Sequence, residues 1–150
     1  MGRQGVSPGR TALACALAWL VPGAGHLYLK RPLKAALFFC LVLIMLFLGL
    51  SLHGRAHVVD HDNPLLSSLA TFANVATGPL DLLIRKSTYH RITYRLPPEG
   101  QSDYDELVAR MRARVLEPTY EYGTTFILTA GLMNILLILD AFDIGIGRKH

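Results

Sequence analysis

Three polar residues interrupt an otherwise apolar stretch near the end of the chain: Asn134, Asp140 and Asp143. A carboxylate inside a hydrophobic segment is costly to ionise, so it normally faces protein, water or a cation. Asp140 and Asp143 are three residues apart and therefore share one face of a helix. Asp140 is expected to pair with a residue near the start of the chain: His26, Tyr28, Arg31 or Lys34. The alternatives are a proton or ion pathway through Asp140, or carboxylates that are solvated at the helix end.

A second group of residues that could take part in chemistry is His53, His57 and His61, which recur at four-residue intervals. On one continuous helix the three imidazoles would lie along one face, and two histidines at this spacing can chelate one metal ion. Gly54 disfavours that helix, because it stands where the preceding apolar segment should end. The sequence therefore leaves two interpretations open, a metal or haem site and a set of polar side chains at a membrane surface.

The sequence contains no complete catalytic or phosphate-binding motif. It lacks a glycine-rich loop followed by Lys-Ser/Thr, a His-Glu-x-x-His motif and a Gly-x-Ser-x-Gly motif. Cys15 and Cys40 both lie in hydrophobic segments, which argues against a disulfide framework and provides no metal-ligand spacing. These observations predict a protein that is not an enzyme, and they identify no cofactor.

The composition is typical of a membrane protein. Apolar residues make up 51% of the 150 residues and charged residues 17%, below the roughly 25% usual in soluble domains. Residues 35–52 carry no charge, and a helix of this length with its flanking turns can cross a hydrocarbon core of about 30 Å. A second apolar run covers residues 124–139 and continues to Ile144. We therefore predict two long transmembrane helices, at residues 33–53 and 124–145.

A shorter apolar stretch, residues 12–21, precedes the first long segment and is predicted to be a half-helix. Pro22 removes a backbone donor, and Gly23 and Gly25 relax the backbone, so the helix should break there. Backbone groups freed inside hydrocarbon find no water, and such a break is tolerated only at the interface or against other protein. The break therefore predicts close neighbours, including other membrane protein subunits.

The middle of the chain, residues 54–122, is predicted to be an interfacial or extramembrane insertion. Asn63 and Pro64 resemble a helix start, and Leu65, Leu69 and Phe72 follow at helical spacing, as in an amphipathic helix lying on the membrane. The alternative is a third span over residues 64–84, interrupted by Gly78-Pro79 and carrying Asp81. Residues 88–96 alternate like a short strand or extended segment, and a helix is expected from Ser102. The chain is accordingly divided into residues 1–53, 54–122 and 123–150.

The charges differ between these parts. Outside residues 54–122 there are seven Lys and Arg residues against two Asp, whereas inside them there are eight Lys and Arg against nine Asp and Glu. The positive-inside rule then places both termini and the basic residues 30–34 in the cytoplasm. The excess of basic residues, which gives a pI near 9.3, is explained by cytoplasmic residues that face anionic lipid. No nucleic-acid partner is therefore expected.

Two parts of the sequence resemble known membrane families. The turn Pro22-Gly23-Ala24-Gly25-His26-Leu27-Tyr28 and the terminal Leu139-Asp140-Ala141 resemble the two-transmembrane-helix domain family. The tail from Tyr120 to Ile144 is similar to a family of uncharacterised bacterial membrane proteins of about this length. The resemblance implies a compact membrane hairpin without a known catalytic role, in the bacterial inner (cytoplasmic) membrane.

We therefore expect an all-α membrane protein with a broken N-terminal half-helix and two long transmembrane helices. The expected function is noncatalytic, as a structural or assembly subunit of a larger membrane complex, with the lipid bilayer and other membrane subunits as partners. One alternative is a metal- or haem-binding protein using His53, His57 and His61. Another is a small proton- or ion-linked transporter component using Asp140. Polar pairing is assigned to five residues: His26, Tyr28, Asn134, Asp140 and Asp143.

Overall fold

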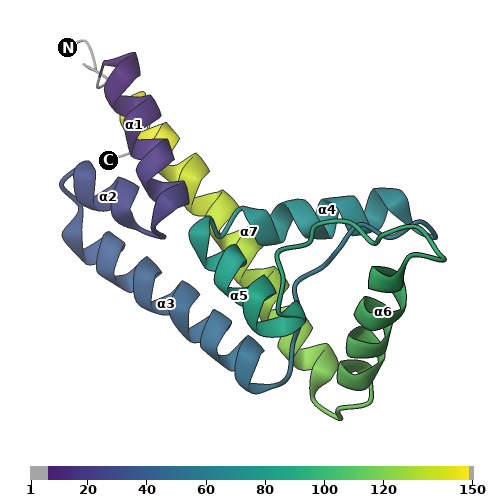
Figure 1. The fold of residues 1–150 in the computed structure, drawn as a ribbon. Helices are drawn as coiled ribbons and strands as arrows, with labels where there is room; N and C mark the ends of the chain where they lie inside the picture. Colours follow the sequence, from purple (N-terminus) through teal and green to yellow (C-terminus); the bar gives the residue numbers. More distant parts are fainter. Residues whose placement is uncertain (1–6, 149–150) are drawn as a thin grey trace.

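The computed structural model describes residues 7–148, and these residues form seven α-helices and no strand (Figure 1). The basic residues Arg3 and Lys149, counted above, lie outside them. The short strand considered over residues 88–96 does not form, because a helix continues to Tyr89 and beyond it only an isolated bridge joins Arg95 to Val59. The helices are α1 (Pro8–Leu20), α2 (Ala24–Tyr28), α3 (Pro32–Ser51), α4 (Pro64–Val75), α5 (Pro79–Tyr89), α6 (Ser102–Val115) and α7 (Tyr120–Gly145).

Helices α3 and α7 form an antiparallel pair, and both are long and apolar enough to cross a membrane. Their bounds agree with the two long segments predicted from the sequence to within a few residues. Pro32 occupies the first turn of α3, where its missing N–H is not needed. At the other end of the pair the chain passes very close to α7, since a Cβ on Gly54 would lie 2.2 Å from the Gly123 carbonyl carbon.

The predicted break in the first helix is present. α1 ends at Leu20, and the short helix α2 turns back toward the start of α3 (Figure 1). Gly23 makes this turn with a φ of 84°, and a Cβ there would lie 2.5 Å from the Ala35 carbonyl oxygen. α1 lies against the second half of α7, with Thr11 beside Gly145 at one end of the contact. α1 therefore covers only part of the length of α7.

α4 and α5 form a V whose apex is residues 76–78 (Figure 1). The chain is interrupted at Gly78-Pro79, because Gly78 adopts a φ of 68° and Pro79 starts a new helix. An interrupted third span made of these two helices stays a prediction. α4 has the amphipathic character that was predicted, but its apolar side chains point outward. Leu65, Leu69 and Phe72 are 78%, 60% and 65% exposed, whereas the polar residues Thr71 and Asn74 are buried. This arrangement is the reverse of that in a soluble protein.

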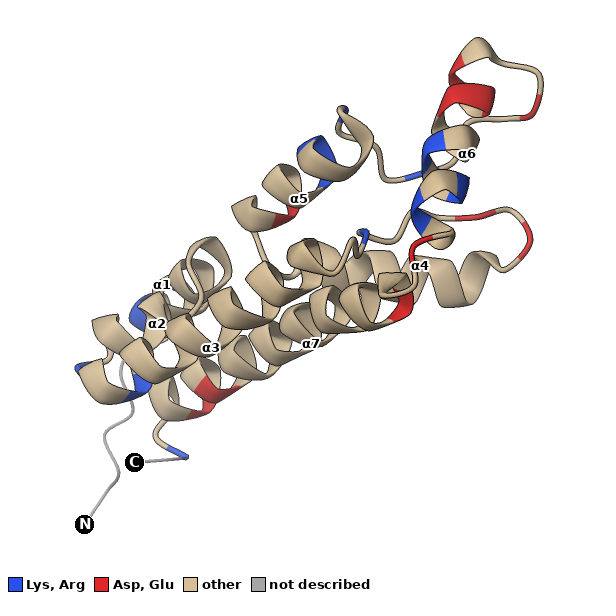
Figure 2. Ribbon diagram, turned by 90° about the horizontal axis from the view of Figure 1, so that it is seen from below, with Lys and Arg blue, Asp and Glu red and all other residues tan. Residues whose placement is uncertain are grey.

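The interior is divided into two apolar clusters. The larger one lies between α3, α5 and α7 and contains Val42, Leu46, Ala56, Ile84, Ile127, Ala130 and Leu137. The smaller one lies under α6 and contains Val58, Tyr89, Leu96 and Leu107. Charged residues gather toward the ends of the α3–α7 pair and on α5 and α6, so the middle of the bundle is free of them in this view (Figure 2).

Candidate functional site

The first buried polar contact lies at the middle of α7, where α1 and the α4–α5 apex meet. Asn134 Nδ2 donates hydrogen bonds to the Ala18 carbonyl at 3.3 Å and to the Ala76 carbonyl at 2.6 Å. Both acceptors are at helix C-termini, where the last carbonyls have no partner within their own helix. The Trp19 indole adds a further bond, to the Val75 carbonyl at 3.2 Å. We call this contact the Asn134 junction.

Glycines allow the helices to approach closely enough for the Asn134 junction to form. A Cβ on Gly78 would lie 2.0 Å from the Trp19 carbonyl oxygen. A Cβ on Gly131 would lie 2.0 Å from the Ala73 carbonyl oxygen. Neither distance is compatible with a side chain, so these two positions require glycine as long as the backbones stay in place.

The second polar contact joins α2, the start of α3 and the end of α7. His26 is fully buried, and its Nε2 lies 3.0 Å from Asp140 Oδ2. Lys34 Nζ lies 3.9 Å from the same oxygen, and the Phe38 ring packs edge-on against the imidazole. Of the four partners considered for Asp140, the structure thus brings two, His26 and Lys34, to its carboxylate. An ion pathway through Asp140 stays a prediction.

Two other residues assigned to polar pairing lie near this contact. The Tyr28 ring lies under the Arg10 guanidinium, with 5.8 Å between the guanidinium carbon and the ring centroid. Asp143 lines a small cavity together with Asp140 and with apolar side chains of α3 and α7. Tyr28 therefore ties α2 to α1, while Asp143 extends the polar end of α7.

The third contact is a buried ion pair on α5 that the sequence analysis did not identify. Arg85 Nε lies 2.7 Å from Asp81 Oδ2, and the two side chains are 0% and 1% exposed. A buried ion pair is tolerated only with further hydrogen bonds. Arg85 Nη1 donates to the carbonyls of His57 and Thr93, and its guanidinium stacks on the Tyr94 ring at 4.2 Å. The four-residue spacing of Asp81 and Arg85 within an apolar segment was the available signal.

Asn74 links this ion pair to α4. Its Oδ1 accepts a hydrogen bond from the His57 backbone N–H at 2.7 Å and lies 3.3 Å from His57 Nδ1. Burial lowers the pKa of the His57 imidazole, the Arg55 and Arg85 charges lower it further, and the contact with Asn74 opposes them. These effects favour the neutral form of His57, in which one ring nitrogen can donate.

The three histidines considered for metal binding are not brought together. α3 ends at Ser51, and His53 has a φ of 59°, so the helical spacing does not continue past the end of α3. His57 contacts Asn74, and His61 is exposed on a bend. Among residues 7–148, no three His, Cys, Asp or Glu side chains are grouped so that they could hold a metal ion.

The three contacts share one chemical property, because each joins segments that are far apart in the sequence through a buried polar group. Together with the fold, they define an all-helical protein with broken helices held on two helices that are long and apolar enough to cross a membrane. A model of a family of unknown function (DUF6677) matches residues 13–150, and the chain belongs to this family. Comparisons with curated proteins and with solved structures found no match. The resemblance to the two-transmembrane-helix domain stays a prediction.

Proposed function

We propose that this protein is a noncatalytic integral membrane protein and serves as a structural or assembly subunit of a larger complex in the bacterial inner membrane. The observation that carries the proposal is the reversed polarity of α4 together with the outward side chains of α3. Leu37 and Phe47 of α3 are 63% and 71% exposed. In water such a surface would promote aggregation, whereas lipid or a partner helix covers it at no cost.

The buried contacts support a scaffolding role. A membrane-embedded polar side chain usually faces a partner, and Asn134, His26 and Arg85 each hold two or more segments together. This arrangement makes the outer surface rigid, which is a property that a subunit interface needs. The same contacts explain why polar residues occur in apolar helices although the sequence contains no complete catalytic motif.

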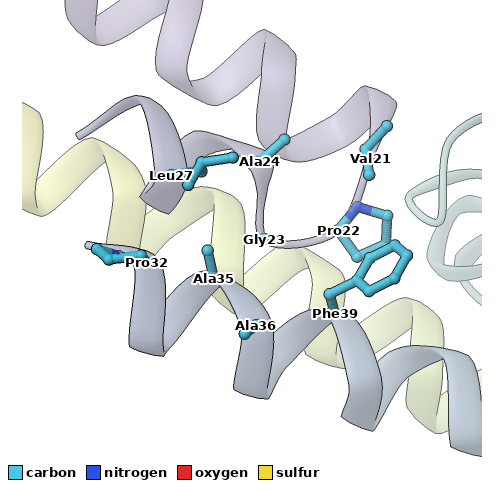
Figure 3. A pocket seen from close by; sticks show the side chains of 9 residues that line it. All are labelled: Val21, Pro22, Gly23, Ala24, Leu27, Pro32, Ala35, Ala36 and Phe39. Carbon is cyan, nitrogen blue, oxygen red and sulfur yellow. The ribbon is translucent and has the colours of Figure 1, made fainter. Parts of the chain in front are cut away.

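An apolar groove between α2 and α3 fits a transmembrane helix of a partner subunit (Figure 3). Its floor carries small side chains, including Ala24, Ala35 and Ala36, which allow another backbone to approach closely. The groove has a volume of about 270 Å³, and the rings of Pro22 and Phe39 border one end of it (Figure 3). Without a hydrophobic driving force in lipid, close packing of this kind is what holds helices together.

The experiment is affinity capture of the chain from its native membranes in mild detergent, followed by mass spectrometry. We expect one partner at a fixed ratio with the wild-type chain and loss of this partner with Ala36→Trp, because the indole fills the groove. Leu37→Trp is the matched control, since it adds the same ring at the neighbouring exposed position outside the groove. A chain that is recovered alone in monodisperse form, or a partner that both variants retain, would argue against the proposal.

A further inference from the structure

Two adjoining cavities lie at the end of the bundle where α3 ends and α7 begins. Their volumes are about 490 and 340 Å³, and they share four lining residues: Arg55, Asp60, Leu96 and Met111. Together they form one groove lined by α4, α6 and residues 55–63, which lie on the same side of the molecule in Figure 1. We call it the Arg55 groove. Neither the Asn134 junction nor the His26–Asp140 contact borders it.

The Arg55 groove contains opposite charges that are not paired with each other. The Arg55 guanidinium stacks on the Tyr120 ring and donates from Nε to the Tyr120 hydroxyl. Its Nη1 is buried and has no hydrogen-bond partner among the described residues. Asp60 and Asp62 line the groove as well, and neither forms an ion pair within residues 7–148. A buried donor without a partner is costly, so a ligand with an anionic group would stabilise Arg55.

The groove also has apolar walls that continue onto the outside of the bundle, and Arg112 is its remaining charged lining residue. Leu66 of α4 and Leu128 of α7 line one half, and Val115 and Leu116 at the end of α6 line the other. Leu66 is 70% exposed and belongs to the apolar face of α4 described above. The groove therefore leads from charged side chains to a surface that would face hydrocarbon.

The depth of the groove matches the headgroup layer of a bilayer. This step rests on the proposed function, because it requires α3 and α7 to span the membrane. Arg55 follows the last residue of α3 by four positions, and Tyr120 is the first residue of α7. Side chains at such positions lie among lipid phosphates and amines.

We propose that the Arg55 groove binds one phosphatidylethanolamine molecule. The lipid phosphate accepts a hydrogen bond from the Arg55 guanidinium, the primary ammonium donates to Asp60 and Asp62, and an acyl chain lies along Leu66 and Leu128. Phosphatidylglycerol has no cation for the two carboxylates. The choline headgroup has a cation but no N–H donor, so it satisfies the carboxylates less well.

The test is native mass spectrometry of the full chain in mild detergent, titrated separately with phosphatidylethanolamine, phosphatidylglycerol and phosphatidylcholine. We expect one saturable site that prefers phosphatidylethanolamine over phosphatidylglycerol by about tenfold, the effect of one charge-assisted hydrogen bond. Asp62→Asn should remove most of this preference. Asp62 is exposed, so this variant leaves the fold intact. Asp105→Asn is the matched control, because it removes an exposed carboxylate of α6 that does not line the groove.

A second variant, Arg55→Lys, keeps the charge but removes Nη1 and should weaken binding of all three lipids. Equal binding of the lipids, or an unchanged preference in Asp62→Asn, would overturn the inference. Saturation by soluble phosphoethanolamine at the same concentration would show a site for the headgroup alone and would also overturn it. If the chain were recovered outside the membrane fraction, the proposed function itself would fail. A membrane-bound chain without lipid preference would contradict only the inference.

Discussion

At the scale of single residues, Asn134 is the position where loss of a polar group should have the largest effect. Its amide is the donor for two carbonyls at helix ends, and leucine has the same branching and number of side-chain heavy atoms but no donor. Each buried acceptor left unpaired costs about 1–3 kcal/mol, so we expect Asn134→Leu to lower the free energy of unfolding by about 2 kcal/mol or more. Denaturant unfolding in detergent measures this change.

Asn63→Leu provides the matched control for this prediction. Asn63 is exposed just before α4, and its side chain makes no capping hydrogen bond. We expect its effect to remain within about 0.5 kcal/mol, as for most surface substitutions. An Asn134→Leu variant as stable as the control would contradict the role assigned to the Asn134 junction.

The sequence identified some residues of these contacts but not their partners. Asn134, Asp140 and His26 could be selected because each interrupts or borders an apolar segment. The carbonyls that Asn134 binds are 116 and 58 positions away, however, and no local pattern encodes such distances. Arg85 was missed because its burial depends on carbonyls of two irregular segments that contact it only in the folded chain.

At the scale of helices, the apex between α4 and α5 depends on Gly78. Its φ of 68° disfavours any side chain, and a Cβ there would lie only 2.0 Å from the Trp19 carbonyl oxygen. Gly78→Ala should therefore separate the apex from α1 and break the bond from the Trp19 indole to Val75. Trp19 is the only tryptophan of the chain, so a shift in its fluorescence emission maximum reports the separation.

Gly100→Ala separates the effect of backbone strain at a positive φ from the effect of the contact at the apex. Gly100 also has a positive φ, at 89°, but a Cβ there would meet no atom within 4 Å. It should cost about 1–2 kcal/mol of backbone strain and leave the Trp19 emission unchanged. If both variants shift the emission equally, contact at the apex is not what positions Trp19.

The helices themselves were predictable to different degrees. The bounds of α3 and α7 follow from apolar length and proline position, which are local properties. The break at Pro22 was predicted for the same reason. α6 begins at Ser102 as expected, although no side chain caps it. The arrangement of residues 64–84 was harder to predict, because Gly78 and Pro79 are compatible either with an interrupted span or with two helices outside the membrane core. Contact with α1 and α7 sets how the two helices lie, and periodicity does not describe that contact.

At the scale of the whole molecule, the two ends of the α3–α7 pair differ in charge and should lie on opposite sides of the membrane. Arg31, Lys34 and Asp140 lie at one end, while the larger irregular part of the chain with α6 lies at the other (Figure 2). The positive-inside rule assigns the first end to the cytoplasm. This orientation places the Arg55 groove in the outer leaflet.

Labelling of single cysteines tests this orientation. In a chain without Cys15 and Cys40, Lys30→Cys and Gln101→Cys put one exposed thiol at each end of the molecule. In sealed vesicles with the cytoplasmic face outward, a membrane-impermeant thiol reagent should modify the Lys30→Cys variant at once. The Gln101→Cys variant should react only after detergent opens the vesicles, because about 30 Å of hydrocarbon separates it from the reagent. Equal labelling of both variants in sealed vesicles would show that α3 does not span the membrane, and the reverse pattern would invert the orientation.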